Sequence, residues 1–260
     1  MAMLDTQISG GIARVSLNRP DVHNAFNSDM IEALTTTFAT LSYDEAVRVV
    51  VLSGNGQSFC AGADLDWMRR ASTCSETENA RDALNLAHML RVVNACWKPV
   101  IGHIHGAALG GGLGLVACCD AVVANEATKF GLTEVRLGLI PATIAPFVIA
   151  KIGVSAARRY MLAGDRFGAQ EALRIGLIHA VTEEADTQIQ SWIDAYLASA
   201  PGAIADTKRL ISEVAQAQID DDLLYMTALR IAARRASDEG SEGMAAFLDK
   251  RKPNWMGDVK

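Results

Sequence analysis

The sequence lacks three things: a surplus of positive charge, a long apolar run and paired cysteines. Its 260 residues carry 24 Lys and Arg against 30 Asp and Glu, a net charge of −6. Because phosphate-driven binding needs a net basic face, this balance argues against a nucleic-acid partner. No stretch of about 18 uncharged apolar residues occurs, so no membrane partner is predicted. Five cysteines without a CxxC pair, and no signal-peptide pattern, indicate a cytoplasmic protein.

What is present is typical of a globular α/β protein. Half of the residues are hydrophobic, and the length suits one large domain or two unequal ones. Short β-branched runs at 12–17 and 47–52 flank a helical pattern that Asn27 or Ser28 can cap, which predicts a parallel strand pair. A capping box at Ser75 and Glu78 predicts a second helix, which Pro99 ends.

The second half of the sequence is predominantly helical in pattern. Strands are expected at 99–105 and near 121–124, and residues from about 142 onward read mostly as helices, with one further strand at 177–181. We therefore predict a core over residues 1–200 and a helical subdomain over 201–260. Because both parts leave apolar faces to cover, self-association is expected.

Two glycine-containing segments are candidate sites, and the first would suit a negatively charged atom. Gly110, Gly111 and Gly112 precede a charge-free stretch, so bare backbone N–H groups would lie at a helix start. Leu115 breaks the dinucleotide-binding pattern GxGxxG, and tight packing against a strand explains the glycines equally well. The segment AGAD at 61–64 follows a strand, where sites are favoured, although a plain loop is the simpler interpretation.

Glu134 is the most unusual charged residue because its neighbours in KFGLTEVRLGLIP are mainly apolar. A carboxylate in such surroundings is costly unless it is paired or used. An ion pair with Arg136 or Lys129 is one explanation; a raised pKa suited to proton transfer near neutral pH is the other. His103 and His105 share a strand face but lack a third ligand, so no metal site is predicted.

Five motifs, in order and at the family's spacing, resemble the crotonase family, also called the enoyl-CoA hydratase/isomerase superfamily: LNRPDVHNAF, FCAGADL, GAALGGGLGL, FGLTEVRLGLIP and EGMAAFLDKRKPNW. The resemblance implies a ClpP-like spiral of ββα units with a C-terminal helical trimerisation region, assembled as a homotrimer or hexamer. It also implies an acyl-CoA thioester substrate. Coenzyme A is then part of the substrate, and no separate cofactor is expected.

The resemblance also implies roles for individual residues. Ala63 and Gly111 match the residues whose backbone N–H groups form the oxyanion hole for the thioester oxygen. Glu134 matches the second of the two hydratase glutamates. Phe247 and Lys250 match tail residues that approach the CoA of a neighbouring subunit. The remaining residues predicted to line the substrate site are Asp64, Leu65, Arg69, Gly110 and Gly114.

One departure from the family pattern lies at Gly114, where the hydratases carry their first glutamate. Three interpretations stay open: hydration with Glu134 as principal acid/base, a Δ3-Δ2 enoyl-CoA isomerase, or a non-catalytic CoA-thioester-binding protein. The segments GLGLVACCD and ADLDWMRR further resemble bacterial 3-methylglutaconyl-CoA and γ-carboxygeranoyl-CoA hydratases, which favours hydration of a branched acyl-CoA. Arg136 and His105 are then candidates to meet a distal carboxylate, and Arg69, Arg70 or Lys250 to meet the CoA phosphates.

Overall fold

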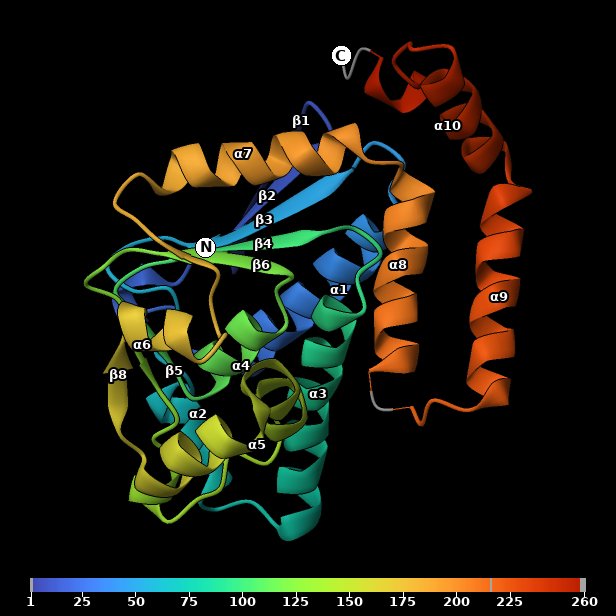
Figure 1. The fold of residues 1–260 in the computed structure, drawn as a ribbon. Coiled ribbons are helices and arrows are strands. Elements are labelled where there is room, and N and C mark those ends of the chain that lie inside the picture. The colour runs from blue at the N-terminus through green and yellow to red at the C-terminus, as the bar shows by residue number, and fades with distance from the viewer. Residues whose placement is uncertain (1, 216, 258–260) are drawn as a thin grey trace. The chain divides into compact units, whose positions relative to one another are not determined.

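A computed structural model describes residues 2–215 and 217–257. The chain divides into two compact units, Met1–Gln190 and Ser191–Lys260. The first contains all of the strands in the described residues and the second is helical (Figure 1). The predicted α/β class is thereby confirmed, while the assembly role of residues 201–260 stays a prediction.

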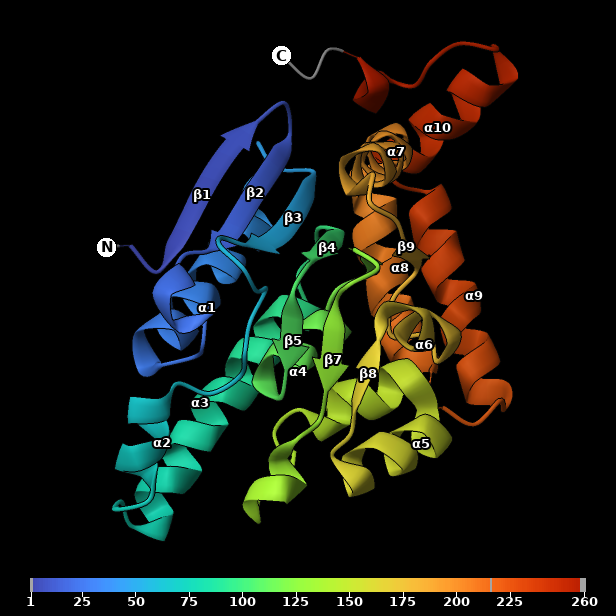
Figure 2. The ribbon, with the colours of Figure 1, turned by 90° about the vertical axis from the view of Figure 1, so that its left-hand side faces the viewer.

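The larger sheet has six strands, and all of its pairings except the first are parallel. Their order is β1 (Leu4–Ser9), β2 (Ile12–Leu17), β3 (Val49–Gly54), β4 (Val100–Ile104), β6 (Ala121–Ala124) and β9 (Ala180–Val181). The parallel β2–β3 pair was predicted, but the antiparallel hairpin of β1 and β2 was not (Figure 2). The pattern of β1 hides this strand, since its residues are mostly exposed.

The two helices predicted from their caps are present. In α1 (Ser28–Tyr43) the Asn27 side chain accepts from the amide of Met30, and α3 (Glu76–Asn94) has the complete Ser75–Glu78 capping box. Both bury their apolar faces against the sheet core. The second helix, predicted to continue as far as Pro99, ends at Asn94 instead, and Trp97 beyond it is 41% exposed.

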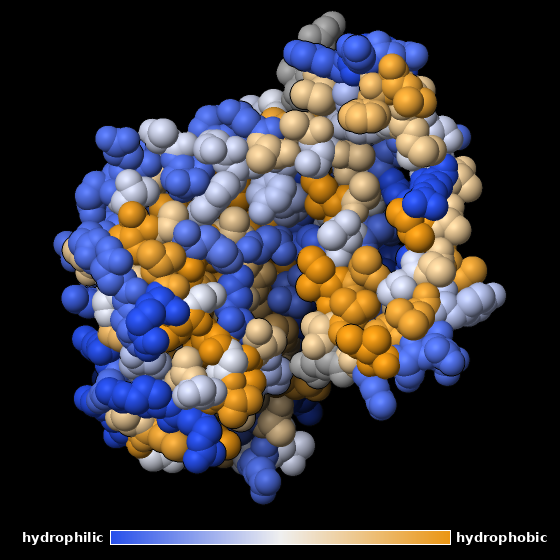
Figure 3. All heavy atoms as spheres, in the orientation of Figure 1, coloured by the Kyte–Doolittle hydropathy of each residue, from blue (hydrophilic) through white to orange (hydrophobic). Residues whose placement is uncertain are grey.

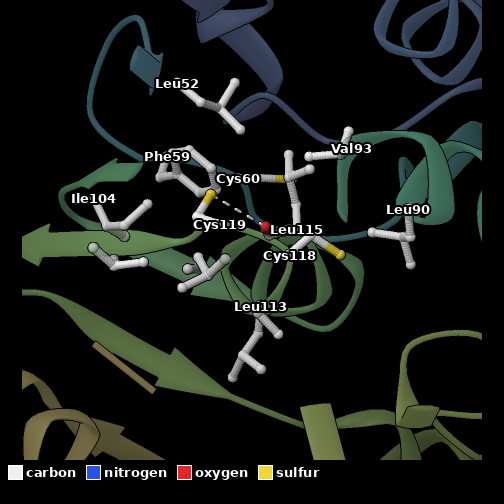
Figure 4. Packing of buried hydrophobic residues seen from close by; sticks show 14 of the residues in the cluster. Leu52, Phe59, Cys60, Leu90, Val93, Ile104, Leu113, Leu115, Cys118 and Cys119 are labelled. Atoms are coloured by element: carbon white, nitrogen blue, oxygen red, sulfur yellow. Dashed lines mark hydrogen bonds between the residues drawn. The ribbon is translucent and has the colours of Figure 1, made fainter. Parts of the chain in front are cut away.

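A second, smaller sheet was not predicted because its strands are only three residues long. It comprises β5 (Ala107–Leu109), β7 (Lys129–Gly131) and β8 (Arg166–Gly168). The charge-free segment after β5 forms α4 (Gly111–Ala117), which is buried from Gly112 onward, as its lack of polar residues requires. Figure 4 shows side chains of β3, β4 and α3 gathered around this helix.

Four short helices and one long helix complete the first unit. The short ones are η1 (Pro20–Val22), α2 (Leu65–Ala71), η2 (Glu134–Leu137) and α6 (Ala169–Arg174), and the long one is α5 (Ala145–Ala163). Then follow α7 (Ala185–Ala198), which crosses into the second unit, α8 (Pro201–Val214), α9 (Asp221–Arg235), α10 (Asp238–Leu248) and η3 (Asn254–Met256). The helical pattern predicted for the tail is confirmed. In Figure 3 apolar side chains gather over α8 and α9. Among the described residues, no helix has the length and apolarity needed to traverse a bilayer.

Candidate functional site

Three parallel segments of backbone end at one edge of the smaller sheet and bring the predicted site residues together. Cys60 bridges Ala108 of β5 in parallel, and Leu109 at the end of β5 pairs in parallel with Gly131 of β7. The chain therefore leaves three neighbouring segments in the same direction, toward residues 61–64, 110–111 and 132–134. Carboxyl ends of parallel strands are favoured positions for ligand sites.

The first predicted donor is the amide of Ala63. A short parallel ladder fixes the peptides on either side of it, since Phe26 donates to the Gly62 carbonyl at 2.7 Å and accepts from the Asp64 amide at 2.9 Å. Because alternate peptides of an extended segment face opposite sides, the Ala63 N–H points away from this ladder. It has no acceptor within residues 2–215 and 217–257, and Ala63 is exposed.

The second predicted donor is the amide of Gly111, the first residue of α4. The preceding Gly110 has φ of 50° and ψ of −120°, a conformation that favours glycine, and its amide donates to Gly131 at 2.9 Å. Gly62 lies directly beside this turn, because a Cβ on Gly62 would lie 3.0 Å from the Leu109 carbonyl oxygen. First-turn amides of a helix lack intrahelical acceptors, so the Gly111 N–H is available to an anionic oxygen.

Glu134 begins η2 beside these donors. A Cβ on Gly110 would lie 3.1 Å from Glu134 Oε1, so this carboxylate reaches the turn that carries Gly111. Its Oε2 atom is buried and has no hydrogen-bond partner in the described part of the chain. Burial raises the pKa of Glu134, and the hydrogen bond from its own backbone offsets this only in part. A carboxyl with one free, buried oxygen and a raised pKa is a candidate for proton transfer.

The ion pair offered as the alternative explanation for Glu134 does not form. Arg136 instead donates to Asp165 at 2.8 Å, and Asp165 also accepts from Arg159 at 2.8 Å. Lys129 is exposed and is not among the ion pairs of residues 2–215 and 217–257. Neither candidate cation therefore pairs with Glu134.

Asp64 and Leu65 follow the first donor at the start of α2, and Arg69 lies in the last turn of this helix. The Asp64 carboxylate caps this helix by accepting from the amides of Asp66 and Trp67, and it pairs with Arg19 at 2.9 Å. Burial would raise the pKa of Asp64, but Arg19 and the two amides together hold it below its ordinary value. Leu65 is 70% exposed, and Arg69 forms an exposed pair with Asp66 at 2.7 Å. These contacts favour a supporting role for Asp64.

Gly114 is buried inside α4, and the space a side chain would need there is filled. A Cβ on Gly114 would lie 2.4 Å from Cγ2 of Ile144 and 2.8 Å from its Cβ. Ile144 is itself 1% exposed. Ile144 thus occupies the direction in which a first glutamate would extend, so the packing as well as the sequence leaves position 114 without a carboxylate.

Phe247 and Lys250 belong to the second unit. Phe247, near the end of α10, is 83% exposed, and Lys250 follows in the left-handed conformation with φ of 55°. Their predicted approach to the CoA of a neighbouring subunit stays a prediction. Both are accessible on the surface of their own unit.

Other candidates are engaged elsewhere. His105 Nε2 lies 3.0 Å from the Gly56 carbonyl oxygen, and Arg136 is held by Asp165. No group of three or more metal-binding side chains occurs in the portion of the chain described. Sequence reasoning missed Arg19 and Phe26, which brace the first donor loop, although both lie in the LNRPDVHNAF motif.

Comparisons with known proteins agree with this geometry. The family model for enoyl-CoA hydratase/isomerase matches residues 7–258. An enoyl-CoA hydratase crystal structure from Shewanella pealeana is 42% identical with a TM-score of 0.96, covering 97% of this chain and 96% of that one. Crotonyl-CoA hydratase of Syntrophomonas wolfei is 32% identical, and 2,3-dehydroadipyl-CoA hydratase of Escherichia coli is 33% identical; each comparison covers 94% of both chains. The fold is therefore the predicted crotonase fold, and the chain belongs to the enoyl-CoA hydratase/isomerase family.

Proposed function

We propose that this protein adds water reversibly across the α,β double bond of an acyl-CoA thioester. Enoyl-CoA hydratase activity is supported at the level of the family. The observation that carries the proposal is the buried, unpartnered Oε2 of Glu134 beside two backbone amides that have no acceptor among the described residues. The amides of Ala63 and Gly111 would bind the thioester oxygen as negative charge develops on it.

Glu134 alone supplies the proton transfers in this mechanism. Its carboxylate accepts a proton from water as the water oxygen bonds to the β-carbon, and the π electrons move toward the thioester carbonyl. The resulting enolate oxygen is held by the two amides. Glu134 then returns a proton to the α-carbon on the same face, so one water is added and the carboxylate is regenerated.

The test of this assignment is Glu134→Gln in the purified protein. We expect kcat to fall about 100-fold or more, because glutamine keeps the shape and loses the exchangeable proton. Glu45→Gln, which neutralises an exposed glutamate before β3, is the matched control and should retain wild-type kcat. Near-normal turnover by Glu134→Gln would reject the role of this residue.

A Δ3-Δ2 enoyl-CoA isomerase is the second candidate, favoured by the packing of Ile144 where a second carboxylate would begin. Such an enzyme needs one group to move a proton between two carbons and incorporates no water. Turnover in H₂¹⁸O separates the reactions, since only hydration places the label in the acyl product. The third interpretation, a CoA-thioester-binding protein without activity, predicts that the protein binds acyl-CoA thioesters and converts none of them.

For the acyl group we propose a branched chain with a distal carboxylate, such as 3-methylglutaconyl-CoA. The support comes from the subgroup motifs GLGLVACCD and ADLDWMRR, and from the E. coli relative, which is named for a dehydroadipyl-CoA substrate. The Syntrophomonas relative, named for crotonyl-CoA, is equally similar overall. A turnover screen against 3-methylglutaconyl-CoA, crotonyl-CoA and a 3-enoyl-CoA tests the choice directly, and the highest kcat/KM should belong to the first.

We also propose that the protein assembles with copies of itself through its tail. Several large apolar side chains of α8 and α9 are at least half exposed: Ile211, Leu224, Tyr225, Leu229 and Ile231. An apolar surface of this kind on a tail of helices is costly in water and is typical of an interface. A homotrimer or hexamer is the expected assembly.

A further inference from the structure

One buried residue, Phe26, contacts both segments that carry the predicted donors of the oxyanion hole: its backbone pairs with the loop of Ala63, and its ring lies at Gly111. On the backbone side it pairs with the loop of Ala63, accepting from the Asp64 amide at 2.9 Å and donating to the Gly62 carbonyl at 2.7 Å. The peptides before and after Ala63 are therefore both fixed by the same residue. No other residue between 2–215 and 217–257 makes backbone hydrogen bonds to both Gly62 and Asp64.

The side chain of Phe26 contacts the second donor, because its ring lies against Gly111. A Cβ on Gly111 would lie 3.0 Å from Cδ2 of this ring and 3.1 Å from Cε2. These distances are shorter than ordinary carbon contacts of about 3.5–4.0 Å, so the ring faces the Gly111 α-carbon without room for a methyl group. The start of α4, and with it the Gly111 amide, rests on the aromatic ring.

The residues on either side of Phe26, Ala25 and Asn27, are both fixed by hydrogen bonds. Arg19 donates to the Ala25 carbonyl at 2.6 Å and to the Asp64 carboxylate at 2.9 Å, which joins the two segments of the ladder. Asn27 caps α1 through the Met30 amide. The ring is 1% exposed and belongs to the close-packed core, so it has little freedom to move.

We propose that Phe26 is the positioning residue of the oxyanion hole, setting the separation and direction of the Ala63 and Gly111 amides. The inference rests on the proposed function, because it presumes that these amides bind the thioester oxygen. Hydrogen bonds to a developing oxyanion require donors about 2.7–3.1 Å away, so a displacement of a few tenths of an ångström at one donor weakens catalysis. Phe26 itself contacts no reacting atom and acts through the two amides.

The test replaces the ring and leaves the backbone ladder in place. Phe26→Leu, with Phe26→Met as a second variant should leucine impair folding, is compared with Phe38→Leu. Phe38 lies on α1, is equally buried and is absent from the contacts of both donors, so it controls for loss of core volume. We expect kcat to fall about 10-fold for the Phe26 variants while KM changes less than about threefold, and Phe38→Leu to retain wild-type kcat.

A spectroscopic readout reports the oxyanion hole without turnover. Cinnamoyl-CoA should absorb at longer wavelength when its carbonyl is polarised by two amides, and Glu134→Gln as the background keeps the probe intact. We expect the shift to shrink when Phe26→Leu is added and to stay unchanged when Phe38→Leu is added. Gly111→Ala should also lose the shift, because its methyl meets the ring, and Gly111→Ala with Phe26→Leu should recover part of it.

The outcomes separate this inference from the function on which it rests. Suppose that Glu134→Gln shifts the cinnamoyl-CoA absorbance as expected. If adding Phe26→Leu then leaves this shift unchanged, and Phe26→Leu alone leaves kcat unchanged, the role of Phe26 is overturned and the oxyanion hole is not. Absence of any shift in that background, together with no turnover by the wild type, would overturn the proposed oxyanion hole and the Phe26 role with it. Equal losses from Phe26→Leu and Phe38→Leu would reduce Phe26 to an ordinary core residue.

Discussion

Asp165 holds the guanidinium of Arg136 at 2.8 Å, so the positive charge two residues after Glu134 is paired with another carboxylate. Gly164 supports the same arrangement, since a Cβ on it would lie 2.9 Å from Cγ of Arg136. The raised pKa of Glu134 therefore depends on burial without compensation from the arginine that follows it in sequence.

Asp165→Asn should release Arg136 to approach Glu134. A guanidinium near this carboxyl stabilises its charged form, so the pKa of Glu134 should fall and the acid limb of the kcat/KM profile should move to lower pH. In the wild type that limb should lie above the ordinary glutamate pKa of about 4.3. Adding Arg136→Gln to Asp165→Asn should return the limb to its wild-type position, and an unmoved limb in the single variant would contradict the arrangement.

Glu134→Gln should stabilise the folded protein at neutral pH even as it abolishes turnover. Because the pKa of Glu134 is higher folded than unfolded, its contribution is most favourable below its unfolded pKa and is lost as pH rises through the folded pKa. The gain at pH 7 should be up to about 1 kcal/mol, since solvent partly screens this half-buried group. Urea denaturation at pH 7 and pH 4 measures it, and a variant less stable than wild type at pH 7 would be inconsistent.

Gly114→Ala should destabilise the protein by about 1–3 kcal/mol, because its methyl overlaps Ile144 in a packed core. Gly168→Ala is the control, as no atom lies within 4 Å of a Cβ there and its φ is −89°. Thermal unfolding should show the loss for Gly114→Ala alone, and Ile144→Ala should relieve part of it in the double variant. Additive losses in that double variant would mean the two positions do not compete for space.

The CoA phosphates should be met by local positive charge despite the net charge of −6. We expect the triple variant of Arg69, Arg70 and Lys250 to alanine to bind acyl-CoA more weakly, with a larger effect at low salt than at high salt. Titration calorimetry at two salt concentrations measures this. A control triple variant removes three other exposed arginines: Arg14, Arg81 and Arg158. Equal weakening in both would indicate a general charge effect.

The apolar face of α9 should be required for assembly. Leu224→Ser with Tyr225→Ser replaces two side chains that are 57% and 68% exposed, and should lower the particle mass from the trimer or hexamer toward the monomer. Light scattering after size exclusion gives the mass directly. Leu162→Ser, at a 70% exposed leucine of α5, is the control and should leave the mass unchanged. A monomeric wild-type protein would refute self-association.

Long and well-capped elements were predictable from the sequence because their signals are local. Asn27 and the Ser75–Glu78 box mark α1 and α3, and the charge-free stretch before Asp120 indicates a buried helix. Strands of three residues such as β5 and β7 carry too little periodicity to be recognised, yet they bring the donors and Glu134 to one edge.

The site was predictable residue by residue only where the family motifs apply. Periodicity and spacing alone left Glu134 between an ion pair and a catalytic group. The pairing of Arg136 with Asp165, 29 residues later, removes the ion pair with that arginine, and the catalytic role stays a prediction. The contact of Phe26 with Gly111 joins positions 85 apart and leaves no local pattern. Such long-range contacts follow from the fold and not from any short window of sequence.

The packing of Ile144 on Gly114 also limits how this enzyme can change over generations. Gly114→Glu as a single mutation would place its side chain where Ile144 already packs, so it would lower the stability of the folded protein before it could help catalysis. To gain a second catalytic carboxylate at position 114, the protein must first replace Ile144 with a smaller residue and remain folded with the resulting cavity, so the order of the two mutations is constrained. Directed evolution of this protein should accordingly select a smaller residue at position 144 before it selects glutamate at position 114.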